Sequence, residues 1–410
     1  MKTGYKQSEV GVIPEDWEVC PVRHKGEVIT GKALAVNAPG QQRPYLRTKN
    51  VFDGRIDIDD VLTMPMTDEQ FAQFRIRNGD VLLNEGQSLE LVGRCAIYQD
   101  EYPEPCAIQN ALLRFRARSG VSDTFASYLF RHCQQTGVFA RIALQTTSVA
   151  HLGGSRFERL ILPWPTEAEQ RAIAEALSDV DALLASLDRL IAKKRDLKTA
   201  AMQQLLTGKT RLPGFSGEWE IKKLGEIAEM GSGGTPTSSV TAYYDGDIPW
   251  VSISDMTKGG KVIVRTDRNL TRLGFTNSAA QMFPAGTILY AMYASLGECS
   301  IAGISLCSSQ AILGIRPKEK LDVGFLFYFL TSLKSVVKTL GQQGTQANLN
   351  KGMVQDFTLS LPSIPEQTAI ADVLSDMDAE LTALEKRRDK TRDLKQGMMQ
   401  VLLTGRTRLV

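Results

Sequence analysis

The chain has few of the side chains that build metal sites or disulfide frameworks. Its 410 residues include three histidines and six scattered cysteines, with no Cys-x-x-Cys pair, so we predict buried reduced thiols and no bound metal. Nowhere do about 18 apolar residues follow one another as in a membrane span, and Met1 to Lys6 open no apolar signal region. We therefore expect a cytoplasmic protein.

Net charge is also low. The chain carries 48 Lys and Arg against 46 Asp and Glu, a formal charge of +2, which permits DNA binding without demonstrating it. With 43% hydrophobic and 23% charged residues, a chain of this length is expected to fold throughout into two or three domains.

The chain contains a tandem repeat. Residues 171–212 read RAIAEALSDVDALLASLDRLIAKKRDLKTAAMQQLLTGKTRL, and residues 368–409 read TAIADVLSDMDAELTALEKRRDKTRDLKQGMMQVLLTGRTRL. More than half of the aligned positions are identical without a gap. A Leu-Pro pair and then a Glu-Gln pair precede each copy, at Leu162, Glu169, Leu361 and Glu366. The sequence therefore predicts a duplicated unit.

Each copy predicts a long helix with a heptad seam, because its apolar residues recur alternately four and three positions apart. The predicted coiled-coil positions are Ile173, Leu177, Val180, Leu184, Leu187 and Ile191 in the first copy, and Ile370, Leu374, Met377, Leu381 and Leu384 in the second. Gly208 and Gly405 stand where a C-terminal glycine cap is expected. One helix cannot bury such a stripe alone, so we expect the copies to pair antiparallel. The alternative is two separate helices, each packed on its own domain.

The segments before the helices share a layout more than a sequence. Both have a Trp after an acidic residue near the start, at Trp17 and Trp219, and short β-branched runs broken by Gly and Pro. We predict an α+β protein with two mixed α/β domains, residues 1–166 and 208–363, and two long helices, residues 167–207 and 364–406. The helices would form an antiparallel coiled coil with pseudo-twofold symmetry. A constant scaffold with differing domains suits a protein that reads two unlike targets at a fixed spacing.

Strings that would carry chemistry are incomplete. Gly208-Lys209-Thr210 resembles the end of a phosphate-binding loop, but Gln203 stands where that loop needs glycine. The glycine-rich stretch from Gly231 to Pro236 has no such lysine either, and no Asn-Pro-Pro-Tyr or Asp-Pro-Pro-Tyr loop of an adenine methyltransferase occurs. We therefore predict no catalytic residues.

Hydrogen-bonding side chains near turns are suited to base edges, since Arg reads guanine and Asn or Gln reads adenine in the major groove. In the first domain the candidate DNA contacts are Arg47, Lys49, Asn50, Gln87, Ser88, Gln109, Asn110, Thr146, Thr147 and His151. In the second domain they are Gly233, Thr235, Thr237, Tyr244, Ser252, Ser254, Lys258, Tyr293, Gln310, Gln346, Asn348, Asn350 and Lys351. Taken singly, each is also an ordinary turn or surface residue.

These features together resemble the specificity subunit of type I restriction-modification systems over essentially the whole chain. The residues responsible are LILPWPTEAEQRAIAEALSDVDALL and LSLPSIPEQTAIADVLSDMDAEL, the ends MQQLLTGKTRL and MQVLLTGRTRL, and GGTPTSS followed by YYDGDIPWVSISDM. The first domain departs from this pattern, with TGKALAVNAPG in place of the GGTP string, so its base contacts are less defined.

The resemblance implies a non-catalytic subunit that binds a split double-stranded DNA target, one part per domain, with unspecified base pairs between. It also implies two methyltransferase subunits docked along the helices, and restriction and translocation subunits beyond them. Cofactors would then belong to the partners: S-adenosylmethionine for adenine methylation, and ATP and Mg²⁺ for translocation. This chain would bind no cofactor and contact no membrane.

Three other interpretations stay open. One is a stand-alone restriction and methylation enzyme, against which the missing methyltransferase loop argues. Another is a coiled-coil adaptor that never touches DNA. A third, closer alternative is the recognition subunit of a modification-only or bifunctional relative.

Overall fold

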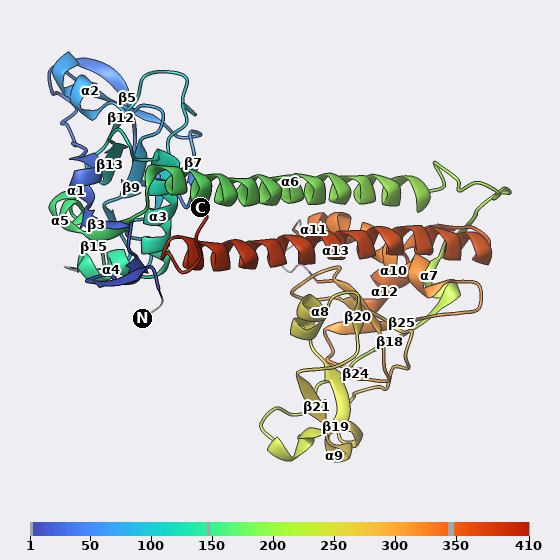
Figure 1. Cartoon of the computed structure of the whole chain (residues 1–410). Coiled ribbons are helices and arrows are strands. Elements are labelled where there is room, and N and C mark those ends of the chain that lie inside the picture. Colours follow the sequence, from blue (N-terminus) through green and yellow to red (C-terminus); the bar gives the residue numbers. More distant parts are fainter. Residues whose placement is uncertain (1–2, 146–147, 343–347, 410) are drawn as a thin grey trace. The chain divides into compact units, whose positions relative to one another are not determined.

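The computed structural model describes residues 3–145, 148–342 and 348–409. The chain divides into two compact units, Met1–Asp188 with Arg387–Val410, and Arg189–Lys386. Each unit contains one globular domain and parts of both long helices, α6 (Glu167–Leu205) and α13 (Ile364–Leu402) (Figure 1). Each unit is therefore assembled from stretches that are distant in sequence.

The first domain is built on two β-sheets, of order β11-β9-β13-β4 and β12-β5-β8. Their strands are β4 (Gly26–Thr30), β9 (Val81–Asn84), β11 (Cys95–Ile97) and β13 (Leu112–Ala117), and β5 (Gln41–Leu46), β8 (Leu62–Met66) and β12 (Ala107–Ile108). Shorter strands are β1 (Tyr5–Ser8), β2 (Gly11–Pro14), β3 (Glu18–Pro21), β6 (Val51–Phe52), β7 (Arg55–Ile56), β10 (Gly86–Gln87), β14 (Leu144–Gln145), β15 (Ala150–His151) and β16 (Ile161–Trp164). Helical segments are α1 (Val22–Lys25), η1 (Thr48–Asn50), α2 (Asp68–Phe74), α3 (Asp123–Gln135), α4 (Val138–Ile142) and α5 (Gly154–Arg159).

The second domain repeats this plan, with sheets of order β18-β25-β22-β23-β20 and β21-β19-β24. Its strands are β17 (Glu220–Lys223), β18 (Ala228–Ser232), β19 (Tyr244–Val251), β20 (Val262–Ile263), β21 (Arg268–Leu270), β22 (Ile288–Ala291), β23 (Cys299–Ala302), β24 (Cys307–Ser308), β25 (Ile312–Pro317) and β26 (Thr358–Leu361). Its helical segments are α7 (Leu224–Ile227), η2 (Thr241–Tyr243), α8 (Ile253–Gly259), α9 (Arg272–Thr276), α10 (Val323–Ser332), α11 (Lys334–Gln342) and α12 (Lys351–Gln355).

The main core of the first domain lies between its larger sheet and α3. Alternation along β13 directs Leu113 and Phe115 into this core and Leu112 into the core of the smaller sheet. The hydroxyl of Ser122 caps α3 by accepting a hydrogen bond from the Phe125 amide, and the helix then buries an apolar face against the sheet. The core is completed by Ile173 and Leu177 of α6 and by Met399, Leu402 and Leu403 at the end of the chain.

The two long helices pack together in antiparallel fashion within each unit. In the first unit Asp181 and Asp188 of α6 pair with Lys395 and Arg388 of α13, so α13 numbers fall as α6 numbers rise. In the second unit Lys194 and Lys198 pair with Glu380 and Asp378 in the same sense. Each predicted seam position is buried or half-buried, which confirms the paired helices. The first turns of α6 and α13 also pack on their own domains, which is the feature expected from the alternative of two separate helices.

The glycines after the helices have the expected conformation. Gly208 has a φ of 69° and Gly405 a φ of 70°, in the left-handed region that glycine adopts without strain. Their role as helix caps is confirmed.

The Glu-Gln pair at the start of each long helix attaches the helix to its domain. The buried carboxylate of Glu169 accepts hydrogen bonds from Trp17 Nε1 at 2.8 Å and Arg408 Nε at 2.6 Å. Glu366, equally buried, accepts one from Arg211 Nη2 at 2.6 Å. The neighbouring Gln170 accepts from the Ser122 amide, and Gln367 accepts from the Asp322 amide, at the caps of α3 and α10. The repeated Glu-Gln pair therefore holds each long helix to its domain.

The GGTP segment of the second domain needs its glycines for close packing. A Cβ on Gly234 would lie 2.3 Å from the backbone carbon of Ala279, and one on Gly233 would lie 2.3 Å from the Ser308 carbonyl oxygen. Because backbone cannot yield as a side chain does, we expect Gly234→Ala to destabilise the second domain by about 1–3 kcal/mol.

Gly397, inside α13 with open space around its Cβ position, provides the control. There Gly397→Ala is expected to stabilise by up to about 1 kcal/mol, because alanine is the better helix former. Thermal unfolding of both variants tests the sign, and an unchanged Gly234→Ala variant would contradict the close packing.

Candidate DNA-recognition surface

The same backbone hydrogen bonds frame one exposed turn in each domain. In the first domain the amides of Gln109 and Leu112 donate to the carbonyls of Leu46 and Gln109. In the second domain the amides of Ser309 and Ile312 donate to the carbonyls of Val251 and Ser309. The turn therefore follows a short strand of the smaller sheet and leads into a central strand of the larger sheet in both domains.

Two further hydrogen bonds bring other loops to this turn. Glu85 donates its amide to the Ala111 carbonyl, and the Leu152 amide donates to the Glu85 carbonyl. In the second domain the equivalent bonds are donated by the Met292 amide to the Ala311 carbonyl and by the Leu349 amide to the Met292 carbonyl. We call these two places the strand-end surfaces; each is formed by the turn, the segment after β9 or β22, and the segment before α5 or α12.

An exposed amide side chain stands at the tip of each turn. Asn110 and Gln310 are both exposed, although strand residues on either side are buried. Gln310 accepts a hydrogen bond from the Thr235 hydroxyl, which links the turn to the GGTP segment. The two predicted residues therefore occupy equivalent positions, a relation that their different local sequences concealed.

Other predicted residues of the first domain gather on its strand-end surface. Gln87 pairs with Ala150 in the register of β10 and β15, and Gly86 pairs with His151. The exposed His151 ring places Nδ1 3.1 Å from Glu85 Oε2. Ser88 is exposed beside Gln87.

Two cations, Lys49 of η1 and Arg47 just before it, bind one carboxylate, that of Asp60. Asp60 accepts hydrogen bonds from Arg47 Nη2 at 2.7 Å and Lys49 Nζ at 2.6 Å, so one positive charge remains uncompensated within this group. The hydrogen bond from Lys49 lowers the pKa of Asp60. Asn50 differs from these, because its side chain is buried and bonded to the Arg47 amide and to the carbonyls of Asp57 and Asp60. The Asn50 side chain therefore stabilises the conformation of this turn.

In the second domain several candidates are engaged in local structure. Tyr244 donates its hydroxyl to the Pro236 carbonyl, Ser252 caps α8, Asn350 caps α12, and Lys258 pairs with Asp267. The remaining candidates are exposed: Thr235, Thr237, Ser254, Tyr293, Asn348 and Lys351. Thr146, Thr147 and Gln346 lie outside the described residues.

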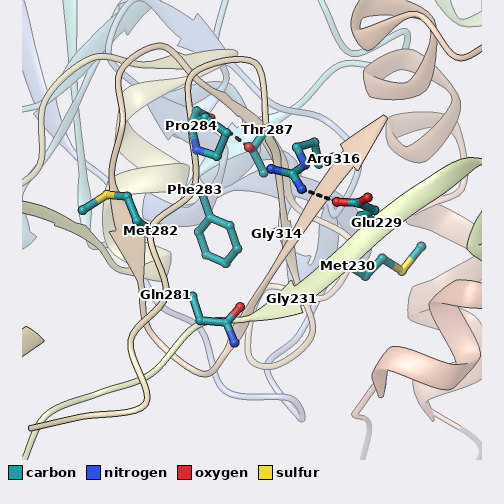
Figure 2. A pocket seen from close by; sticks show the side chains of 10 residues that line it. All are labelled: Glu229, Met230, Gly231, Gln281, Met282, Phe283, Pro284, Thr287, Gly314 and Arg316. Atoms are coloured by element: carbon teal, nitrogen blue, oxygen red, sulfur yellow. Dashed lines mark hydrogen bonds and ion pairs between the residues drawn. The ribbon is translucent and has the colours of Figure 1, made fainter. Parts of the chain in front are cut away.

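A pocket of the second domain, lined by residues of β18, β25 and the 281–284 segment, shows packing rather than chemistry (Figure 2). Inside it Arg316 pairs with Glu229 and lowers the pKa of that carboxyl through their hydrogen bond. The ring of Phe283 faces Gly314, where a Cβ would lie 2.3 Å from a ring carbon. The two charged lining residues neutralise each other, so this pocket presents no free acid, base or nucleophile.

Within the described ranges, no three His, Cys, Asp or Glu side chains come together as ligands for a metal ion. In the same part of the chain, no helix has both the length and the apolar character needed to cross a bilayer.

The comparisons with known proteins agree over nearly the whole chain. The model of the type I restriction modification DNA specificity domain matches residues 14–193 and again 216–391. A putative type I restriction enzyme MjaX specificity subunit of Methanocaldococcus jannaschii is 27% identical, over 99% of this chain and 97% of the relative. The MjaVIII specificity subunit of the same organism is 24% identical, over 97% and 94%.

Solved structures show the same fold. The HsdS subunit from Thermoanaerobacter tengcongensis aligns with a TM-score of 0.52 at 19% identity, covering 96% of this chain and 98% of that one. A chain from a study of complex assembly and conformational transition of the type I R-M system aligns with a TM-score of 0.63 at 18% identity, covering 96% and 99%.

Two unlike recognition domains on a shared helix pair define a DNA specificity protein. The chain belongs to the family of type I restriction modification DNA specificity domains and carries two of them. It is a specificity subunit, the non-catalytic component of such a complex. The resemblance, the α+β fold class and the recognition function expected from the sequence are confirmed.

Sequence reasoning missed the residues that attach the domains to the helices, among them Tyr128, Asp181 and Lys395. A signal was present: Asp181 aligns with Asp378, and Lys198 with Lys395, in the ungapped repeat. The charges alone did not reveal the junctions, because their partners lie in other elements.

Proposed function

We propose that this specificity subunit reads a bipartite double-stranded DNA target, one half with each strand-end surface, across a fixed number of unspecified base pairs. Residues 1–166 and 208–363 are the two target-recognition domains, and the long helices, residues 167–207 and 364–406, carry two methyltransferase subunits and the restriction subunits. S-adenosylmethionine, ATP and Mg²⁺ are bound by those partners, and the complex works on DNA in the cytoplasm.

The observation that carries this proposal is the repeated turn with an exposed amide. Asn110 and Gln310 stand on equivalent backbone frames, and an Asn or Gln amide forms two hydrogen bonds with the major-groove edge of adenine. Around them the side chains differ between the domains: Gln87, His151 and Arg47 in the first, Thr235 and Tyr293 in the second. Equal frames with unequal surroundings suit the reading of two different half-sites.

The small net charge is consistent with a surface that supplies specificity more than affinity. Phosphate contacts give most of the non-specific binding of DNA, whereas base contacts carry sequence information. With a formal charge of +2, the chain leaves much of the phosphate contact to its partners.

The test is single-molecule mapping of methylated adenines in cells that contain the methyltransferase partner, with and without this chain. We expect one bipartite motif that depends on the chain. Exchange of residues 1–166 should change one half of the motif, and exchange of 208–363 the other. Asn110→Ala should relax one position of the first half, and Gln310→Ala one position of the second, each by about 1–3 kcal/mol of discrimination.

Leu89→Ala provides a matched control, since this exposed side chain lies near the first surface and offers no hydrogen bond. If no motif depended on the chain, a coiled-coil adaptor that never reads DNA would be the better account. A motif whose halves both changed with either domain would contradict the assignment of one half to each.

A further inference from the structure

Three side chains from three different elements meet where the first domain rests on the helix pair. Lys395 Nζ, from α13, donates to Asp181 of α6 at 2.6 and 2.7 Å, and Tyr128 of α3 donates its hydroxyl to the same carboxylate at 2.8 Å. The ammonium also lies 5.3 Å from the centre of the Tyr128 ring. Only 8% of the Lys395 side chain is exposed, and burial lowers its pKa.

The second unit repeats this cluster with the roles of the helices exchanged. Lys198 now comes from α6 and pairs with Asp378 of α13, while Tyr328 of α10 donates its hydroxyl to Asp378 at 2.7 Å. Lys198 lies 5.4 Å from the centre of the Tyr328 ring. We call the two clusters the Tyr-Asp-Lys junctions.

A second cation accompanies each junction from a different place. Arg131 of α3 has Nη1 3.6 Å from Asp181, and Lys261, in the segment before β20, donates to the Tyr328 hydroxyl at 2.8 Å. Lys261 also donates to Ser375 of α13 at 3.2 Å. Both cations also lie over the ring of the junction tyrosine, Arg131 at 5.6 Å from the centre of the Tyr128 ring and Lys261 at 4.6 Å from that of Tyr328. Two positions outside the sequence repeat have thus supplied a second positive charge to the cluster.

Stability alone does not explain such a cluster. Removing an ammonium and a carboxylate from water costs about as much as their attraction returns, and apolar side chains of similar volume often serve as well. The best-attested use of a buried polar pair is to specify register. Here the tyrosine extends that register from the helix pair to the domain, because a shift of one helical turn, about 5.4 Å, separates its hydroxyl from the carboxylate.

We propose that the two Tyr-Asp-Lys junctions are positioning elements that fix the angle of each recognition domain on the helix pair, and thereby the number of base pairs accepted between the half-sites. This rests on the proposed reading of a bipartite target. Both α6 and α13 contribute residues to both units, so the angle of either domain on the helices enters the spacing.

A small rotation of one domain on the helices is enough to change the spacing by one base pair, so the loss of one junction can matter. A domain of roughly 160 residues has a radius of gyration of about 15 Å, so its far face lies about 40 Å from its attachment. A rotation of about 5° moves that face by roughly 3.5 Å, as much as the rise of about 3.4 Å per base pair. Loss of the junction is therefore expected to admit spacers one base pair longer or shorter.

The test compares two sets of substitutions one helical turn apart in the full chain. The junction variant combines Lys198→Met, Asp378→Leu and Tyr328→Phe, which keep the volume of the cluster and remove its polar bonds. The control combines Lys194→Met and Glu380→Gln, which remove an ion pair between the helices that involves no tyrosine. Each is co-expressed with the methyltransferase partner, and methylation is measured on targets with the natural spacer and with one base pair added or removed.

For the unsubstituted chain and the control, we expect the natural spacer to be preferred by about tenfold or more, the penalty of one mismatched base pair. The junction variant should lose most of this preference while still methylating the natural target and recognising the same half-sites. An unchanged spacer preference in a folded junction variant would overturn the inference.

If the triple variant does not fold, Tyr328→Phe alone decides, because it keeps the Lys198–Asp378 pair and removes the hydroxyl through which α10 is bonded to Asp378. A single variant with undiminished preference would also overturn the inference. If the unsubstituted chain produced no bipartite motif at all, the proposed function itself would fail, and the two failures are thus distinct.

Discussion

Lys395→Ala is expected to destabilise the first unit by about 2–3 kcal/mol, because it removes the two hydrogen bonds from the buried ammonium to the Asp181 carboxylate and the cation that lies over the Tyr128 ring. The effect should appear as faster hydrogen exchange in peptides covering α3, the helix that carries Tyr128. Peptides of the second domain should be little changed, since Lys395 contributes only to the first unit.

The corresponding control is Lys194→Ala. This lysine also joins α6 to α13, through Glu380, but the two side chains are 30% and 46% exposed. A pair so accessible to water contributes about 0–1 kcal/mol. Equal losses in the two variants would show that the buried position of Lys395 has no special energetic weight. An apolar replacement of the whole junction should instead recover most of the stability, which separates the cost of an unpaired charge from the positioning role.

Glu169→Ala is expected to have an effect of similar size, about 3 kcal/mol, since it removes the acceptor of Arg408 and of the buried Trp17 indole at once. The measurement is denaturant unfolding combined with the NMR signal of the Trp17 indole N–H, which should move when its acceptor is lost.

Glu167→Ala, two residues earlier on the same helix, provides the comparison. Its exposed carboxylate pairs with Arg171, so we expect a loss below about 0.5 kcal/mol and an unchanged indole signal. A Glu169→Ala variant as stable as Glu167→Ala would mean that the start of α6 does not depend on this bond.

The repeat made the scaffold predictable from the sequence. A heptad seam and a capping glycine are local signals, and both appear twice, so the long helices and their pairing follow from Ile173, Leu374 and similar positions. Strands such as β13 and β25 were also visible, because runs like ALLRFRA alternate toward two cores.

The attachment of domains to helices was not predictable in the same way. Lys395 and Lys198 stand in a basic stretch that suits a solvated face, and their burial depends on a tyrosine that is distant in sequence. Asn50 shows the reverse: it looked available for base contact, and the fold uses its amide to close a turn. Long-range partners decide both cases, and spacing along one chain does not contain them.

The equivalence of Asn110 and Gln310 was hidden for another reason. Of the four aligned positions only Ala111 and Ala311 are identical, too little to mark the turns as equivalent, and their backbone hydrogen bonds to neighbouring strands show that they correspond. Recognition surfaces that read different bases are expected to differ in sequence for this functional reason.

The discontinuous first unit has a consequence for synthesis. Met399, Leu402 and Leu403 complete the core around Phe125 and Trp164, yet they are translated after the whole second domain. At about 5–20 residues per second, the first domain waits roughly 10 to 40 s with part of its apolar surface uncovered. The nascent first domain is therefore exposed to aggregation during this interval, and any change that slows translation of the second half prolongs its need for chaperones.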